Sequence, residues 1–285
     1  MTAAARSWQD LLSGGRARLV RAGIDEADNK LRWVAAHLLG CGLLDVLRHL
    51  HEAPAPEQAA RFAAALARLE TDEPVQYVIG ETDFMGLTFR CDARALIPRP
   101  ETEGLVACAE EFLRDRERPV VVDVCTGTGC IACALAKRVP RARIVATDLS
   151  SAALDLAREN ARALGAAVEF RQADLLAGMD GASVDLVVSN PPYVAAAEIA
   201  RLDRTVRDFE PRLALDGGVD GLRTISRLVA EAAYVLKSKG MLMMEIGEDQ
   251  AGAIEEILCH TPRLQFQHLK SDFAGKCRVA TAVRT

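Results

Sequence analysis

Apolar positions follow two different patterns along the chain, and the change falls near residue 80. In the first part they recur every three or four residues, as in Leu31, Val34 and Leu38. This spacing places apolar side chains along one face of a helix. Further helices are expected over residues 43–52 and 56–69. The first part of the chain is therefore predicted to form a small helical bundle.

After residue 100, short β-branched runs alternate with helical patterns. Strands are predicted over residues 120–124, 143–147, 168–171, 185–189 and 241–246, with two more at the C-terminal end, and helices over 101–114, 131–139, 152–164, 221–237 and 250–259. Such alternation predicts a parallel sheet with helices on both faces. Residues 82–90 alternate around Gly86 and predict a hairpin. The expected fold is α/β: a doubly wound, mainly parallel seven-stranded sheet beside the helical bundle.

The segment Asn190-Pro191-Pro192-Tyr193 directly follows the apolar run at residues 184–189. Open α/β sheets bind ligands at the carboxyl ends of their strands. Because proline has no backbone N–H, the carbonyls and the side-chain oxygen of Asn190 form a rigid mouth rich in acceptors, suited to a planar NH2 group. Tyr193 would stack on that group. The alternative is an ordinary turn at a strand end, since Asn-Pro alone marks turns.

A second candidate site begins at residues 120–124, a β-branched run that leads into a loop of small residues and then a helix. A strand, turn and helix in this order bind nucleotide-like cofactors, and glycines let the backbone approach the ligand. The loop consists of Cys125, Thr126, Gly127, Thr128 and Gly129. This pattern differs from the G-x-G-x-x-G loop that holds a pyrophosphate.

Two aspartates indicate which cofactor the loop would take. Asp123, at the end of the strand, would repel phosphates but suits a cation or an amine. S-adenosylmethionine carries both, as its sulfonium and its α-amino group. Asp148 follows the next predicted strand, where a carboxylate can accept hydrogen bonds from both ribose hydroxyls.

Six segments, in this order, resemble the glutamine methyltransferases that modify peptide chain release factors, the PrmC/HemK type. They are residues 73–80, 96–103, 123–131, 190–193, 210–218 and 245–247. The resemblance runs from about residue 70 to the C-terminus and is fainter over the N-terminal helices. It implies a class I methyltransferase fold and S-adenosyl-L-methionine as cofactor. The implied reaction is methylation of the side-chain amide nitrogen of the glutamine in a Gly-Gly-Gln motif.

The resemblance also implies roles for individual residues. The catalytic residues would be Asn190, Pro191 and Tyr193, and Pro192 would join them in binding the acceptor. The cofactor would contact Asp123, Cys125, Thr126, Gly127, Thr128, Gly129, Asp148, Leu149, Asp174, Leu175 and Asn190. Three positions depart from the family pattern. Cys125 replaces a frequent glycine, Met85 stands where Phe-Tyr-Gly is common, and Leu175 stands where an aromatic residue is frequent.

The chain is 285 residues long, near the size at which one core splits into two domains. We predict an N-terminal substrate-recognition domain over residues 1–80, a hairpin linker over 81–98 and the methyltransferase domain over 99–285. The release factor would be the protein partner. Arg99 lies between two prolines, Pro98 and Pro100. Three interpretations of it are left open: it closes over the active site, it binds the cofactor carboxylate, or it belongs to a plain connecting loop.

Composition limits the alternatives. A net charge of −5 argues against a protein that grips nucleic acid mainly through phosphates. No apolar run approaches the roughly 20 residues of a membrane span, and residues 1–10 lack a signal-peptide core, so a cytoplasmic protein without a membrane partner is expected. The eight cysteines are scattered, and Cys130-x-x-Cys133 lies inside a predicted helix without a second ligand pair, so packing is favoured over a metal site.

Three other functions share some of these features. An adenine methyltransferase of DNA would use the same acceptors at residues 190–193 for an exocyclic amine. The net negative charge and the lack of a recognisable target-recognition domain favour glutamine as the substrate. A glutamine methyltransferase acting on a ribosomal protein would share nearly every motif; residues 97–101 look more like the release-factor type. A non-catalytic nucleotide-binding module is disfavoured by the intact Asn190, Asp123 and Asp148.

Overall fold

The computed structural model describes residues 7–272 and 274–285. The first six residues, where the expectations about the N-terminus and the first domain begin, lie outside this range. The described chain forms two compact units. One contains the residues up to Glu81 together with Asp203–Phe209, and the other contains Thr82–Leu202 and Glu210–Thr285.

The first unit is a helical bundle, as predicted. It contains α1 (Trp8–Arg21), α2 (Ala27–Leu39), the 3-10 helix η1 (Asp45–His49), α3 (Pro56–Leu69), α4 (Val75–Ile79) and α8 (Arg204–Arg207). Its core includes Trp8, Leu31 and Phe62, and the Trp8 and Phe62 rings meet edge to face with centroids 6.1 Å apart. Apolar side chains spaced along α1, α2 and α3 thus meet in one core.

The helix expected over residues 43–52 is wrong in type and length. The structure has only η1, five residues long. Val46 is the one buried residue of η1, whereas Leu44 and Leu47 are exposed. A segment with a single buried side chain has no apolar face to hold a longer helix against the bundle.

The predicted hairpin consists of β1 (Glu81–Phe84) and β2 (Leu87–Arg90). Its two turn residues, Met85 and Gly86, have φ values of 54° and 76°. Two consecutive residues with positive φ form the tight turn whose twist matches that of the strands.

The second unit is built on a seven-stranded sheet in the order β5-β4-β3-β6-β7-β9-β8. Its strands are β3 (Val120–Val124), β4 (Arg143–Asp148), β5 (Val168–Gln172), β6 (Val184–Ser189), β7 (Leu236–Glu245), β8 (Leu264–Ser271) and β9 (Cys277–Arg284). The first five are parallel, and β9 runs antiparallel to both β7 and β8. The predicted mainly parallel seven-stranded sheet is confirmed.

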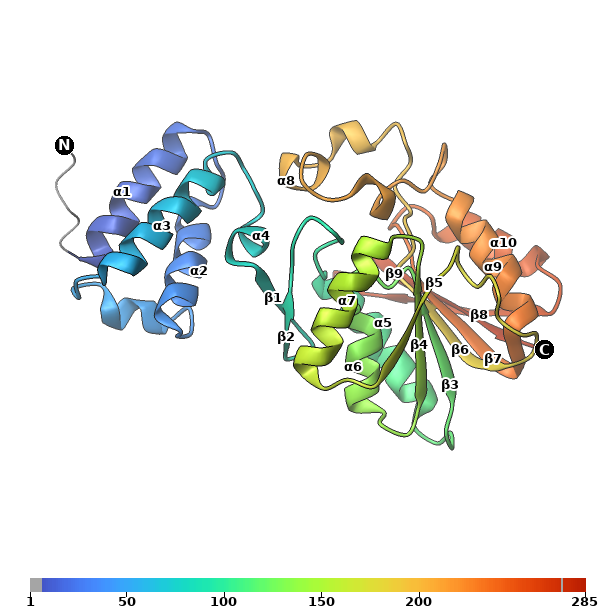
Figure 1. The fold of residues 1–285 in the computed structure, drawn as a ribbon. Helices are drawn as coiled ribbons and strands as arrows, with labels where there is room; N and C mark the ends of the chain where they lie inside the picture. Colours follow the sequence, from blue (N-terminus) through green and yellow to red (C-terminus); the bar gives the residue numbers. More distant parts are fainter. Residues whose placement is uncertain (1–6, 273) are drawn as a thin grey trace. The chain divides into compact units, whose positions relative to one another are not determined.

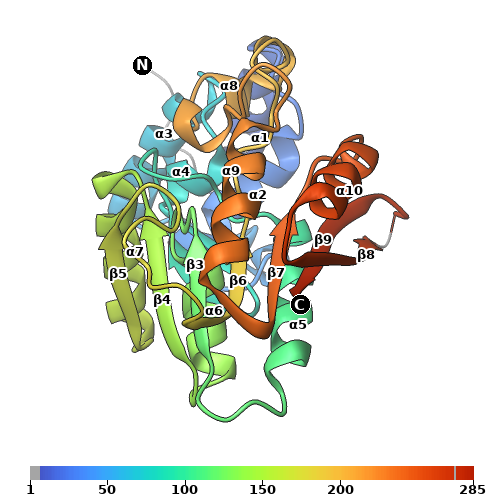
Figure 2. The ribbon, with the colours of Figure 1, turned by 90° about the vertical axis from the view of Figure 1, so that its right-hand side faces the viewer.

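Helices cover both faces of this sheet (Figures 1 and 2). The covering helices are α5 (Pro100–Leu113), α6 (Cys130–Arg138), α7 (Ser151–Leu164), α9 (Arg223–Val235) and α10 (Ala251–His260). Two short 3-10 helices, η2 (Ile199–Arg201) and η3 (Arg212–Ala214), lie in the segment between β6 and α9. One apolar core joins α5 and α6 to alternate strand residues such as Val121 and Ile144. A separate core joins α9 and α10 to the intervening residues, such as Val122 and Val145. The alternation follows from the two-residue period of a strand.

The strand β7 begins earlier than expected, at Leu236, and ends the preceding helix at Val235. Leu236 pairs with Val184 of β6, and a bulge follows before Leu186 pairs with Met241. Residues 237–240 lack the apolar pattern of a buried strand, so the sequence did not indicate that the strand begins at Leu236. Among the described residues, no helix has the length and apolar character required to cross a membrane.

Candidate active site

Three parallel strands bring the predicted site segments together at one edge of the sheet. Val124, at the end of β3, pairs with Thr147 of β4 on one side and with Ser189 of β6 on the other. The Ser189 hydroxyl also donates to the Val124 carbonyl, 2.7 Å away. The segments that follow these three strands therefore start side by side. The chain continues from β3 to β4 on one side and later to β6 on the other, and such a switch point is where open sheets bind ligands.

A cavity of about 360 Å³ opens at this edge. Ten of the predicted site residues line it: Cys125, Thr126, Gly127, Thr128, Asp148, Leu149, Asp174, Leu175, Asn190 and Pro192. Four others, Asp123, Gly129, Pro191 and Tyr193, are not among its described lining residues. Arg99 lies in the wall, and Arg94, Ile97, Thr102 and Arg227, which were not predicted as site residues, lie there as well.

Asp123 is fully buried and directly precedes the segment whose residues 125–128 line the cavity, separated from it only by Val124. Its Oδ2 accepts hydrogen bonds from the Thr126 hydroxyl at 2.6 Å and from the Ala132 backbone N–H at 3.1 Å. Burial raises the pKa of this carboxyl to about 7, and the two hydrogen bonds partly counteract the effect. Its other oxygen, Oδ1, has no hydrogen-bond partner among the described residues. Asp123 thus holds the loop against the first turn of α6.

The loop after β3 needs unusual backbone conformations. Cys125, Gly127 and Gly129 have φ values of 59°, 55° and 79°. At Gly129, an added Cβ would come within 3.0 Å of the Ala157 side chain. Glycine is therefore required at that position, whereas Cys125 adopts a left-handed conformation that costs a non-glycine residue about 1–2 kcal/mol. A glycine at position 125 would adopt this conformation without that cost.

Asp148 presents its carboxylate to the cavity from the end of β4. Its Oδ2 accepts from the Gly127 backbone N–H and its Oδ1 from the Ser150 backbone N–H, each at 2.9 Å. Partial burial raises the pKa of Asp148, and these N–H groups oppose the change. A carboxylate accepts more hydrogen bonds than these, so the fixed Asp148 side chain can still accept from the hydroxyls of a ribose.

Apolar and charged groups complete this half of the cavity. Leu175 is buried with a φ of 53°, and its carbonyl accepts the Thr147 hydroxyl at 2.9 Å. Next to it, Asp174 pairs with Arg227 at 2.9 Å. Leu149, half exposed at the cavity, provides a second apolar side chain. The lining therefore combines aliphatic surface with a fixed carboxylate, a set that fits the adenosine part of S-adenosylmethionine.

Asn190 is held by a hydrogen-bonded chain that starts in the core. Its Nδ2 donates to the Thr102 hydroxyl oxygen at 3.2 Å, and Thr102 donates to Glu245 Oε2 at 2.6 Å. The Tyr193 hydroxyl donates to Glu245 Oε1 at 3.3 Å. Burial raises the pKa of Glu245, and the bonds from Thr102 and Tyr193 oppose it. Tyr193 is thus turned toward Glu245, and its predicted stacking on a substrate stays a prediction.

The turn at residues 190–193 is further fixed by Gln250. Its Nε2 donates to the Tyr193 carbonyl at 2.9 Å, while its Oε1 accepts from the Gly247 backbone N–H at 3.0 Å. Gly221 packs so closely that an added Cβ would lie 2.3 Å from the Tyr193 carbonyl oxygen. Gln250 and Gly221 therefore fix the backbone of the turn that follows Asn190.

Arg99 pairs with Glu210, whose side chain is almost completely buried. Glu210 also accepts from the Ile97 backbone N–H at 3.0 Å. Burial raises the pKa of Glu210, and the positive charge of Arg99 opposes this. The pair ties the segment before α5 to the segment before η3, so Arg99 helps to build the cavity wall.

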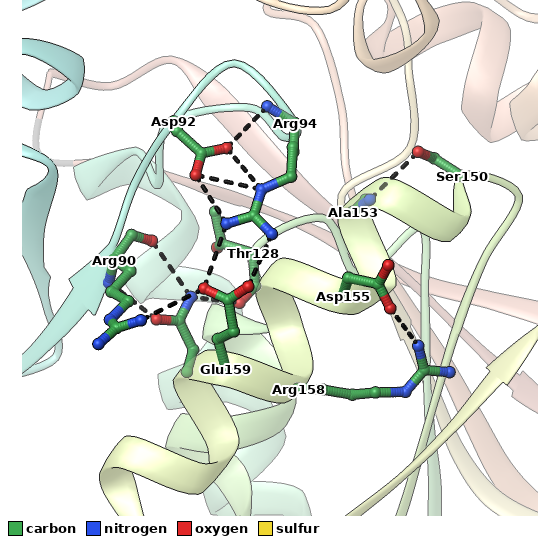
Figure 3. Close-up of polar contacts among 10 residues, drawn as sticks. Arg90, Asp92, Arg94, Thr128, Ser150, Ala153, Asp155, Arg158 and Glu159 are labelled. Carbon is green, nitrogen blue, oxygen red and sulfur yellow. Dashed lines mark hydrogen bonds and ion pairs between the residues drawn. The ribbon is translucent and has the colours of Figure 1, made fainter.

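A second ion-pair network anchors the segment that leads into the wall (Figure 3). The Arg94 guanidinium contacts both Asp92, at 2.7 Å, and Glu159 of α7, at 2.8 Å. Beside it, the buried Asn160 accepts from the Arg90 backbone N–H and donates to the Thr128 carbonyl, at 2.8 and 2.9 Å. These contacts join β2, α7 and the loop after β3.

Sequence reasoning missed these supporting residues because their partners are far apart in the chain: 70 residues separate Asn160 from Arg90, and 143 separate Thr102 from Glu245. The only indication was that Thr102 and Glu245 fall within segments of the family resemblance. Within residues 7–272 and 274–285, no group of three or more His, Cys, Asp or Glu side chains is arranged to hold a metal ion. Cys130 and Cys133 are both buried in α6.

The sequence matches two family descriptions, the PrmC N-terminal domain over residues 10–80 and the methyltransferase small domain over residues 106–220. A release factor glutamine methyltransferase of Cereibacter sphaeroides is 45% identical over 277 residues, covering 96% of this chain and 97% of the relative. One from Deinococcus radiodurans is 41% identical over 276 residues, covering 97% and 98%.

Among solved structures, the hMettl16 catalytic domain in complex with the MAT2A 3'UTR hairpin 1 superposes with a TM-score of 0.54. The alignment covers 80% of each chain at 15% sequence identity. At that identity the likeness concerns the fold alone, and it agrees with the predicted class I methyltransferase fold.

Proposed function

The chain belongs to the family of release factor glutamine methyltransferases, and from this premise we propose that it methylates the glutamine of the Gly-Gly-Gln motif in a peptide chain release factor. The methyl group of S-adenosyl-L-methionine is transferred to the side-chain amide nitrogen. The observation that carries the proposal is the position of Asn190: it lines the same cavity as the Asp148 carboxylate, and its own NH2 group is bound to Thr102. Its amide oxygen is the atom left to accept from a substrate NH2.

An amide nitrogen is a poor nucleophile because its lone pair is delocalised into the carbonyl. When bound, the cofactor supplies an electrophilic methyl group on a sulfonium. Asn190 accepts a hydrogen bond from the substrate NH2, and this bond strengthens as positive charge develops on nitrogen, which stabilises the transition state more than the ground state. Alignment of the amide with the methyl group contributes up to roughly 7–11 kcal/mol through proximity. The alkylated nitrogen then releases a proton to solvent.

The remaining predicted residues take supporting roles in this proposal. Pro191 is buried, so its carbonyl as a second acceptor stays a prediction, and Pro192 forms part of the cavity wall. Asp148 would bind the ribose hydroxyls, with Leu149 and Leu175 against adenine and Asp174 at its edge. Residues 125–129 would carry the rest of the cofactor, and Asp123 would support that loop from below.

We propose that residues 1–80 recognise the protein substrate, that 81–98 act as a linker and that 99–285 carry the chemistry. The motivation is that the described residues lining the cavity lie in 99–285 and at the end of the linker, in residues 94–98, whereas the described part of residues 1–80 consists of helices and the segments that join them. A large protein partner, rather than nucleic acid or a membrane, fits this division, and the proposed location is the cytoplasm.

Adenine in DNA is the main rival substrate, because an exocyclic amine could use the same acceptor. A ribosomal protein glutamine is the nearer rival. The two relatives described above favour the release factor over both rivals. They are named for that substrate, and they align with this chain over nearly their full length. The overall negative charge also disfavours a phosphate backbone as partner.

The decisive experiment incubates the protein with cofactor labelled in its methyl group and with three acceptors in parallel. These are a whole release factor, the same factor with Gln of its Gly-Gly-Gln motif replaced by Ala, and duplex DNA. Label should enter the first acceptor only. Label in DNA, or equal label in both forms of the factor, would contradict the proposal.

A further inference from the structure

Two buried polar residues outside the predicted site, Thr102 and Glu245, are joined to Asn190 through hydrogen bonds. Thr102 lies in the first turn of α5 and is 2% exposed, and Glu245 ends β7 and is also 2% exposed. Buried polar side chains of this kind are stable only when their hydrogen bonds are satisfied. Here they are satisfied by each other and by the 190–193 turn.

The direction of each hydrogen bond follows from Glu245. Both Glu245 oxygens act as acceptors, one for the Tyr193 hydroxyl and the other for the Thr102 hydroxyl, so Thr102 uses its single proton on Glu245. The Thr102 oxygen then has only lone pairs to offer Asn190. The Asn190 amide must therefore turn its NH2 group toward Thr102, which the 3.2 Å contact from Nδ2 shows. An amide has one NH2 and one carbonyl oxygen, so the oxygen is left for the cavity.

Without this constraint the two ends of the Asn190 amide would be nearly equivalent in shape. A flipped amide would present NH2 to the NH2 of a substrate, and two donors would then face each other. The direction of the hydrogen bonds from Asn190 through Thr102 to Glu245 thus decides whether Asn190 presents an acceptor or a donor to a substrate amide nitrogen. Both partners lie in segments that the family resemblance marked, 96–103 and 245–247, but the sequence alone gave neither residue a role.

We propose that Thr102 and Glu245 are positioning residues that hold the Asn190 amide with its oxygen toward the substrate NH2. This inference rests on the proposed function, since it concerns the acceptor for the same reaction. Neither residue needs to touch the reacting atoms. Tyr193, the second hydroxyl on Glu245, keeps the carboxylate in place from the other side.

Three variants test the role of Thr102. Thr102→Val has nearly the same shape but no hydroxyl, and Thr102→Ser restores the hydroxyl. The matched control is Thr281→Val, a buried threonine of β9 whose hydroxyl bonds to the backbone of His268 in β8. The quantities to measure are kcat and KM with a whole release factor, and Kd for S-adenosylmethionine by calorimetry.

Thr102→Val should lower kcat on the order of 10- to 100-fold, the usual effect of a misdirected group in an active site. The cofactor Kd should stay at the wild-type value, Thr102→Ser should recover most of the turnover, and Thr281→Val should match the wild type. Glu245→Gln keeps the size of the side chain but offers an NH2 that can donate to Thr102, which reverses the chain. It should show a similar loss in kcat with an unchanged Kd, and it decides the matter if Thr102→Val does not fold.

Wild-type turnover in both Thr102→Val and Glu245→Gln would overturn the positioning role while leaving the proposed function intact. A loss that Thr102→Ser fails to recover, or that Thr281→Val shares, would also overturn it, because the effect would then be structural. A wild-type protein that transfers no methyl group to the release factor would contradict the proposed function and the positioning role together.

Discussion

The Asp148 carboxylate accepts a hydrogen bond from the backbone N–H of Gly127 at 2.9 Å, and this bond helps to tie the end of β4 to the loop that follows β3. The carboxylate is therefore fixed before any ligand arrives. Its second oxygen is held in the same way by Ser150. A preorganised acceptor loses little side-chain freedom on binding, which favours affinity.

Replacing Asp148 should weaken the cofactor. Asp148→Ala removes charge-assisted hydrogen bonds to the ribose worth about 1.5–3 kcal/mol, so Kd should rise roughly 10- to 100-fold. Asp148→Asn keeps one acceptor oxygen and should lose less. Calorimetry with S-adenosylmethionine measures both. Asp155→Ala, which removes an exposed carboxylate on α7, is the control and should bind as the wild type does. An unchanged Kd in Asp148→Ala would remove Asp148 from the cofactor site.

The buried Asp123 predicts a pH dependence of stability. Its pKa is about 7 in the folded protein and 3.8 in its ordinary state. Between these values the unfolded chain releases a proton that the folded protein keeps, so stability falls as pH rises from about 4 to about 7 and is constant above. At about 1.4 kcal/mol for each pKa unit, the loss is on the order of 4 kcal/mol.

Urea unfolding of the wild type and of Asp123→Asn, without cofactor, measures this effect. The variant carries no titrating group at position 123 and keeps an oxygen that can accept from Thr126. Its stability relative to the wild type should therefore increase as pH rises from 4 to 7. Two parallel curves over that range would mean that Asp123 stays ionised in the folded protein.

Replacing the buried Asn160 should lower the free energy of unfolding. Asn160→Ala leaves the Arg90 N–H and the Thr128 carbonyl without their buried partner. Each such loss costs about 1–3 kcal/mol, so the variant should lose roughly 2–6 kcal/mol of unfolding free energy. Asn29→Ala, at an exposed position of α2, is the matched control. A loss under 1 kcal/mol in Asn160→Ala would contradict the bridging role.

The strand ends could be predicted from the sequence because parallel strands bring their carboxyl ends to one edge. Asp148 and Asn190 stand at the ends of apolar runs, so the sequence is enough to place both at this edge, where the cavity opens. The turn of Tyr193 toward Glu245 could not be predicted in this way. It depends on β7 lying next to β6, a pairing that brings together two residues 52 positions apart.

Local patterns also failed where tertiary contacts decide the outcome. A helix is expected over residues 43–52, yet Leu43, Leu44 and Leu47 are exposed and the segment forms a short 3-10 helix. At Leu236 the helical pattern continues while pairing with Val184 draws the chain into β7. Propensity is a weak prior that such pairing overrides.

In the proposed reaction Asn190 acts mainly as the acceptor for the substrate amide and contributes little to cofactor affinity. The most direct measurement compares Asn190→Ala with the wild type in two assays, methyl transfer to a whole release factor and calorimetric binding of S-adenosylmethionine. Loss of one acceptor at the reacting nitrogen should lower kcat by about 10²- to 10³-fold. We expect this loss together with a nearly unchanged cofactor Kd. Wild-type turnover, or a folded variant that no longer binds the cofactor, would contradict it.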